Sequence, residues 1–263
     1  MSTLAEFLQP LAAFDAWIIL AAAGVIFAGS FVKGAIGFAL PTIAFAFITM
    51  FLTPQETIGV MILPLLVSNL WQMVRQGLPA AWETFAKYWR LNLVLAGLIG
   101  FVAQLVPKLS PELLVTLLGL VVSVTAALQL AGWRPTAPGP GRTRHRLELA
   151  TGAAGGVIGG LTGVWGPPVL FYLIARATPK TEQIRCQGIV FFLGSVVLVG
   201  AHLKSGVVNE VTLPFSILML VPMALGMVLG LRAQDGMDQE RFRRWTLIVL
   251  CVAGLNLLRQ GLT

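Results

Sequence analysis

Two sequences decide the architecture of this chain: GSFVKGAIGFALP at residues 29–41 and GGVIGGLTGVWGPP at residues 155–168. Both interrupt long apolar stretches with glycine and proline. In a bilayer, backbone that is not helical is tolerated only where protein buries it or where it lines a cavity. Each interruption is therefore a candidate binding site.

The two interruptions are related by a single offset of 126 residues. With this offset, four residues fall on residues of the same type: Gly34 on Gly160, Gly37 on Gly163, Pro41 on Pro167 and Glu56 on Glu182. Interrupted hydrophobic segments at corresponding positions of two halves are the best sequence indication of the substrate site of a secondary transporter. The repeat therefore predicts a transporter with one site between two halves.

The composition is that of a polytopic membrane protein of the all-α class. Of the 263 residues, 57% are apolar and 11% are charged, against roughly 25% charged in soluble domains. Charges and Gly/Pro breaks divide the apolar sequence into ten segments: 16–33, 36–52, 55–76, 91–107, 111–132, 147–163, 167–177, 181–203, 212–232 and 242–260. The second, fourth, sixth and seventh have fewer than the ~20 residues that a spanning helix needs, which predicts half-helices or re-entrant segments.

The basic residues predict the orientation. If the segments alternate across the bilayer, 15 of the 18 Lys and Arg residues fall on one side. Because the cytoplasmic side carries the excess, both termini are predicted to be periplasmic and the basic linker, residues 134–146, cytoplasmic. Residues 1–133 and 147–263 then contain five segments each, which predicts an inverted repeat. The charges lie between apolar segments, so the net charge of +7 indicates no nucleic-acid partner.

Residues 80–90, AAWETFAKYWR, are amphipathic at helical spacing. Trp82, Phe85 and Trp89 share one face, whereas Glu83 and Lys87 lie on the other. This pattern is typical of a helix in the cytoplasmic membrane interface. The alternative is that the sequence is the polar start of the fourth segment.

Pro41 and Pro167 are predicted to begin helices, because proline is tolerated at the first helical position. Free N–H groups at such a helix start attract an anion, and the positive end of the helix dipole adds to this. The residues that supply or flank these donors are Gly37, Phe38, Gly163, Trp165 and Gly166. The alternative for the glycines is close helix packing, since those of residues 152–163 recur every four residues.

Polar residues within the apolar segments are further candidates. Asn69, Gln72 and Gln76 share a face of one segment and either line the pathway or make interhelical hydrogen bonds. Lys33, beside the first break, either meets an anion or snorkels to the surface. Arg185 either contacts substrate or pairs with Glu182 as a topology anchor.

Glu56 and Glu182 each follow a Thr-Pro pair, which favours helix capping and complementation of the helix dipole. They are also among the few carboxylates that could carry a proton if transport is proton-coupled. The two histidines, His145 and His202, belong to no metal-binding pattern, and the sequence has no P-loop and no buried acidic pair. No metal, no cofactor and no enzymatic activity are therefore expected.

At the two breaks the chain resembles the TauE/SafE sulfite exporter family, also called the toluene sulfonate uptake permease family. The resemblance rests on GAIGFALP at residues 34–41 and GLTGVWGPP at 160–168, each followed by a Thr-Pro pair. It implies a bacterial inner-membrane carrier for sulfur-containing anions, such as sulfite or organosulfonates including sulfoacetate, often acting as an exporter. Phe38 and Trp165 depart from the denser glycine runs of many members and could accommodate an organic tail.

The sequence therefore predicts a secondary transporter for a small anionic substrate, embedded in the lipid bilayer. A passive anion channel and an intramembrane enzyme are the alternatives. The particular anion, the coupling ion and the oligomeric state are left open.

Overall fold

The computed structural model describes residues 9–133, 142–233, 236 and 238–262, and within these ranges it is helical and contains no strand. Seven helical stretches of the described chain are long and apolar enough to cross a membrane: Ala16–Ile36, Pro54–Val74, Trp89–Lys108, Pro111–Leu130, Thr181–Ser205, Thr212–Ala233 and Glu240–Leu262. The chain is a multi-pass membrane protein.

In chain order the helices are η1 (Gln9–Ala13), α2 (Ala16–Ile36), α3 (Leu40–Ile48), α4 (Pro54–Val74), α5 (Leu78–Lys87), α6 (Trp89–Val102), η2 (Ala103–Lys108), α7 (Pro111–Leu130), α8 (Arg142–Thr162), α9 (Gly166–Ala175), α10 (Lys180–Ser205), α11 (Thr212–Leu218), α12 (Leu220–Ala233) and α13 (Gln239–Leu262).

Both predicted breaks are present, and the predicted helix starts are confirmed. Between α2 and α3 the chain reverses at Gly37 and Ala39, which have φ angles of 90° and 91°. Between α8 and α9 it turns at Gly163, with φ of 70°. Pro41 and Pro167 lie in the first turns of α3 and α9. These helices have 9 and 10 residues, so at 1.5 Å per residue each covers only about half of the hydrocarbon core.

Several predicted boundaries were wrong. The fourth and sixth segments are not short: α6 continues as η2 to Lys108, and α8 has 21 residues. Helix α8 begins at Arg142, so residues 142–146 of the predicted linker are helical, while residues 134–141 lie outside the described residues. The sequence placed the start of this helix too late, because three arginines precede the apolar part of α8 and were assigned to the linker.

The predicted interfacial helix at residues 80–90 is divided. Helix α5 ends at Lys87, and Trp89 begins α6. Trp82 is 69% exposed and stacks on Phe85, whereas the buried residues of α5 are small or polar. The aromatic face of α5 therefore points away from the protein.

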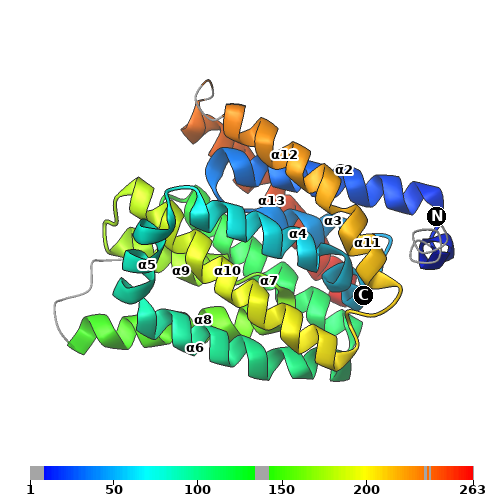
Figure 1. The fold of residues 1–263 in the computed structure, drawn as a ribbon, viewed down its shortest axis with the longest axis horizontal. Coiled ribbons are helices and arrows are strands. Elements are labelled where there is room, and N and C mark those ends of the chain that lie inside the picture. The colour runs from blue at the N-terminus through cyan, green and yellow to red at the C-terminus, as the bar shows by residue number, and fades with distance from the viewer. Residues whose placement is uncertain (1–8, 134–141, 234–235, 237, 263) are drawn as a thin grey trace.

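Helices from the two halves of the chain pack against each other. Helix α2 packs along α12 and α8 packs along α6, at the upper and lower edges of Figure 1, with α4 and α10 in contact between them. Helix α7 packs along α13. Glycines allow the edge pairs to approach closely: a Cβ at Gly34 would lie 2.7 Å from the Met227 carbonyl oxygen, and one at Gly160 would lie 2.8 Å from Val102 Cβ.

The apolar core consists of two clusters, and each short helix is anchored in one of them. Phe45 and Ile48 of α3 are fully buried in the first cluster. Val169 and Leu173 of α9 are fully buried in the second. Burial of these side chains fixes both short helices, and therefore fixes the positions of their first turns.

We expect Gly230→Ala to destabilise the protein, because its Cβ would lie 2.1 Å from the Phe31 carbonyl oxygen in the α2–α12 contact. Overpacking of this kind costs about 1–3 kcal/mol. The measurement is the thermal unfolding midpoint of the purified protein in detergent. Gly24→Ala on α2, whose Cβ would meet nothing within 4 Å, is the matched control; equal midpoints for both variants would contradict the close contact.

Candidate anion site between the two broken helices

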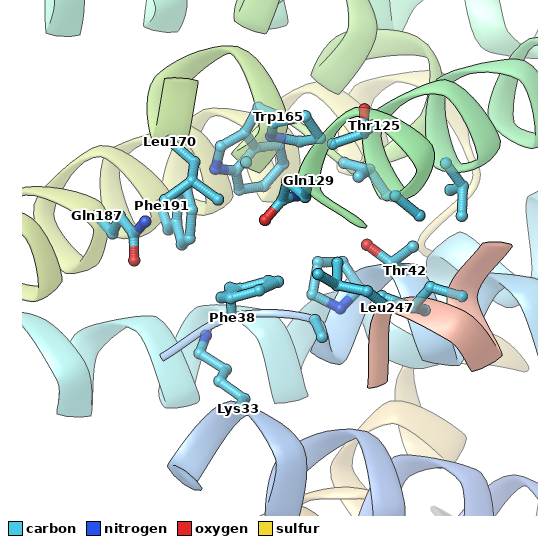
Figure 2. A pocket seen from close by; sticks show the side chains of 18 of the residues that line it. Lys33, Phe38, Thr42, Thr125, Gln129, Trp165, Leu170, Gln187, Phe191 and Leu247 are labelled. Atoms are coloured by element: carbon cyan, nitrogen blue, oxygen red, sulfur yellow. The ribbon is translucent and has the colours of Figure 1, made fainter. Parts of the chain in front are cut away.

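The two breaks face each other across a cavity that holds about 720 Å³ of empty space, its mouth included. Figure 2 shows Phe38 of the first break opposite Trp165 of the second, with Lys33 reaching up from α2 below Phe38. Seven of the predicted site residues line this cavity: Lys33, Phe38, Pro41, Asn69, Trp165, Gly166 and Pro167. The offset in the sequence thus identified two segments that are adjacent in space.

Lys33 is the cation of this cavity. Its residue is only 2% exposed, so the side chain does not snorkel to the surface. The ammonium donates hydrogen bonds to Ser68 Oγ, at 3.0 Å, and to Asn69 Oδ1. Neither partner carries a charge, and none of the ion pairs within the described chain involves Lys33. A buried ammonium whose protein partners are all neutral is a strong site for an anion.

Asn69 connects Lys33 to the second half of the chain. While its Oδ1 accepts from Lys33, its Nδ2 donates to Ser195 Oγ at 2.7 Å and to the Phe191 carbonyl at 3.1 Å. The sequence left two alternatives for Asn69: it either lines the pathway or makes interhelical hydrogen bonds. In the structure Asn69 lines the cavity and also makes interhelical hydrogen bonds.

Backbone donors are available at both breaks, but their number differs. At the first break, the N–H groups of Phe38, Ala39 and Leu40 have no acceptor in the described chain, since the first helical bond of α3 runs from Ile43 to Ala39. At the second, Pro167 and the following proline have no N–H, and the Val164 N–H is bonded to the Thr162 hydroxyl at 3.2 Å. The first break therefore offers more donors than the second.

Sequence reasoning missed four polar residues of the lining: Thr42, Thr125, Gln129 and Gln187. In Figure 2, Gln187 lies near the Lys33 end, whereas Thr42 and Thr125 lie at the opposite end. Gln129 and Gln187 interrupt apolar helices, which is the same signal that identified Asn69. Gln129 Oε1 accepts a hydrogen bond from Arg243 Nη2 at 3.1 Å.

A smaller cavity, which holds about 340 Å³ of empty space with its open mouth included, lies on the other side of Lys33. Its lining includes Gly34, Gly37, Gln72 and Arg75. Gln72 Nε2 donates to the carbonyls of Gly37, at 3.0 Å, and Ile184, at 3.2 Å. This amide ties the first break to α10.

No acidic residue lines either cavity. The carboxylate of Glu148, which is 1% exposed, lies apart from both, bonded to the Tyr172 hydroxyl and within 4 Å of three arginines. In the described part of the chain, no three His, Cys, Asp or Glu side chains are placed to hold a metal ion. The electrostatics of both cavities therefore favour an anion.

Three predicted residues lie outside both cavities and have other contacts. Gly160 packs on α6, and Gly163 provides the left-handed turn beside Met61. Arg185 donates to Thr84 Oγ1 at 2.6 Å and to Gln76 Oε1 at 3.1 Å. These contacts hold α10 against α5 and against the turn that precedes it. Arg185 and Thr84 are 101 residues apart in the sequence, so no local pattern could reveal their contact.

The prediction of capping and dipole complementation is confirmed for Glu56; for Glu182 the capping part was wrong, but the carboxylate does lie in the first turn of α10, at the positive end of the helix dipole. Glu56 forms a reciprocal capping box with Thr53 at the start of α4. Glu182 caps nothing: it pairs with Lys87 Nζ at 2.5 Å and accepts from the Tyr88 hydroxyl at 2.9 Å. Lys87, rather than the predicted Arg185, is its ionic partner, because α5 folds back onto the start of α10.

The chain matches the family described as sulfite exporter TauE/SafE over residues 21–257, nearly its whole length. It belongs to the TauE/SafE family. Neither the comparison with curated proteins nor that with solved structures gave a match. Membership places this TauE/SafE chain among membrane transport proteins, in agreement with a helical chain that carries its cavity between two interrupted helices.

We expect Glu56→Gln to leave stability and the pH dependence of transport unchanged, because glutamine preserves a capping box. Thr53→Ala, which removes the cap, should destabilise the protein by about 0.5–2 kcal/mol. Thermal unfolding and uptake between acidic and neutral pH would be measured for both variants. Loss of the pH dependence in Glu56→Gln alone would instead make Glu56 a proton carrier.

Proposed function

We propose that this TauE/SafE protein is a secondary transporter, and an exporter, of sulfur-containing anions such as sulfite or organosulfonates including sulfoacetate. The anion binds in the larger cavity, between Lys33 and the first turns of α3 and α9. Family membership supports the substrate class. The observation that carries the proposal is the buried, carboxylate-free ammonium of Lys33 in the wall of the cavity.

Burying a charged side chain in a protein costs free energy. Lys33 lies in the last turn of α2 and is only 2% exposed, and charges that are buried in a protein are normally paired. Ser68 and Asn69 solvate Lys33 without neutralising it. An anion entering the cavity supplies the missing countercharge, and its oxygens can accept from the N–H groups of Phe38, Ala39 and Leu40.

The remaining lining suits the organic part of a sulfonate. Phe38, Trp165 and Phe191 form aromatic walls, and Leu170 adds aliphatic surface. With a head group at Lys33, a short tail would extend between these walls toward Thr42 and Thr125. Sulfite, which has no tail, would leave this part of the cavity to water.

We further propose that two inverted repeats, residues 1–133 and the half that follows the linker at 134–146, move against each other to give alternating access. Three features support this. Helix α2 packs on α12 while its counterpart α8 packs on α6. Asn69 and Ser195, 126 residues apart, hydrogen bond to each other. The 3-10 helix η1 and the end of α13 lie toward the right of Figure 1, whereas α8 begins at the left. The proposed location is the bacterial inner membrane, with periplasmic termini.

Lys33→Gln is expected to abolish saturable uptake of labelled sulfite into proteoliposomes, because it removes the charge and keeps a hydrogen-bonding side chain. Asn69→Asp should have the same effect while Lys33 is retained, since a carboxylate beside the ammonium would take the place of the substrate. Ser195→Ala, which alters the hydrogen bonding of Asn69 without changing charge, is the control. Full uptake by Asn69→Asp would contradict the role of Lys33 as countercharge.

Uptake should be screened across sulfite, thiosulfate, sulfate, sulfoacetate and taurine, with Gly37→Leu and Gly163→Leu as further variants. Both glycines have positive φ angles, which leucine rarely adopts, so both variants should lose uptake through distorted breaks. A carrier exchanges internal for external labelled anion and saturates. Flux that neither saturates nor exchanges would show a channel, and undiminished flux in both variants would refute the site at the breaks.

A further inference from the structure

Gln187 of α10 is a buried polar residue in the wall of the larger cavity. It is only 2% exposed, and its side-chain amide has no hydrogen-bond partner within the described part of the chain. Buried polar groups are normally hydrogen-bonded, and a glutamine amide has two N–H donors as well as an acceptor oxygen. An amide left without a partner in a cavity wall is available to a ligand.

Two contacts place this amide beside the first break. A Cβ at Gly37 would lie 3.7 Å from Gln187 Oε1. The carbonyl of Ile184, three residues earlier on α10, accepts from Gln72, which also donates to the carbonyl of Gly37. In Figure 2, Gln187 lies at the same end of the cavity as Lys33. The second half of the chain therefore contributes a neutral hydrogen-bonding group near the cation.

The lining of the larger cavity carries one charge. Among the described residues that line it, only Lys33 is charged, and the polar ones besides it have amide or hydroxyl side chains, as Asn69 and Gln187 do. Amide and backbone N–H groups can bind the oxygens of an anion, but they add no countercharge. A second negative charge on the same head group would therefore be buried without a cation to neutralise it, which costs free energy.

We propose that the larger cavity selects head groups with a single negative charge, which Lys33 neutralises and to which the Gln187 amide donates. This inference rests on the proposed function, because it names the head group that the transport site accepts. A sulfonate or hydrogensulfite carries one charge on its oxygens, whereas sulfate carries two. Gln187 is then a specificity-determining residue, since it binds an oxygen of the head group without supplying a second countercharge.

Methanesulfonate and sulfate are the matched probes, because both have a tetrahedral sulfur with at least three oxygens and they differ by one charge. Each would compete with labelled sulfite for uptake by the full-length wild-type protein in proteoliposomes. The inhibition constant of sulfate should exceed that of methanesulfonate by about tenfold or more, because its second charge has no countercharge in the cavity. Equal constants, or no inhibition by methanesulfonate, would overturn the proposal.

Gln187→Lys tests the role of this residue by adding a second cation. It should lower the inhibition constant of sulfate relative to that of methanesulfonate by about tenfold, because the second charge gains a partner. Gln183→Lys is the matched control, since Gln183 lies about one turn earlier on α10 and lines neither cavity. Equal ratios in the two variants, with the thermal unfolding midpoint showing both folded, would contradict the role of Gln187.

Gln187→Leu tests the donor without adding a charge, and keeps the role testable if Gln187→Lys does not fold. Loss of a hydrogen bond to a charged head group should raise the inhibition constant of methanesulfonate about tenfold, while Gln183→Leu should change it less than about twofold. An unchanged constant in Gln187→Leu would contradict the role. Sulfite uptake that both probes inhibit equally would leave the proposed function standing, whereas a wild type that takes up no sulfite would refute both proposals.

Discussion

The structure depends on one electrostatic constraint: the ammonium of Lys33 is buried among neutral partners. Ser68 and Asn69 orient it, and no acidic side chain lines the cavities that it faces. A protein that only needed a stable fold would gain nothing from a buried cation without a countercharge. The two short helices fit the same account, because residues of their first turns, Pro41 of α3 and Gly166 and Pro167 of α9, line the larger cavity.

Much of this site was predictable from the sequence, because breaks in membrane helices have few explanations. Glycine and proline at residues 34–41 and 160–168 predicted the two helix starts, and the 126-residue offset related the segments that meet across the cavity. Asn69 was found as a polar residue in an apolar helix, and the same criterion applied to Gln129 and Gln187 would have found those residues as well. Composition and hydropathy sufficed for the all-helical membrane fold.

What the sequence did not reveal depends on contacts between distant segments. Gly34 and Gly160 match in the repeat, but a glycine at a close helix contact looks the same in sequence as a glycine at a break. Glu182 was assigned to its helical neighbour Arg185, although the fold supplies Lys87 from 95 residues away. The prolines that mark the start of α9 also remove two of its donors. The backbone cradle is therefore unequal, and Lys33 has no cationic counterpart, since its offset position holds Gly159.

The most direct measurement is the position of an anion bound to the wild-type protein. Crystals soaked with selenite, the selenium analogue of sulfite, would locate the anion by its anomalous scattering. We predict a selenium peak beside Lys33, placed so that a selenite oxygen lies within hydrogen-bonding distance of Lys33 Nζ, on the side of the larger cavity and next to the N–H groups of Phe38, Ala39 and Leu40. Selenium bound only elsewhere, with the space beside Lys33 empty, would contradict the central claim.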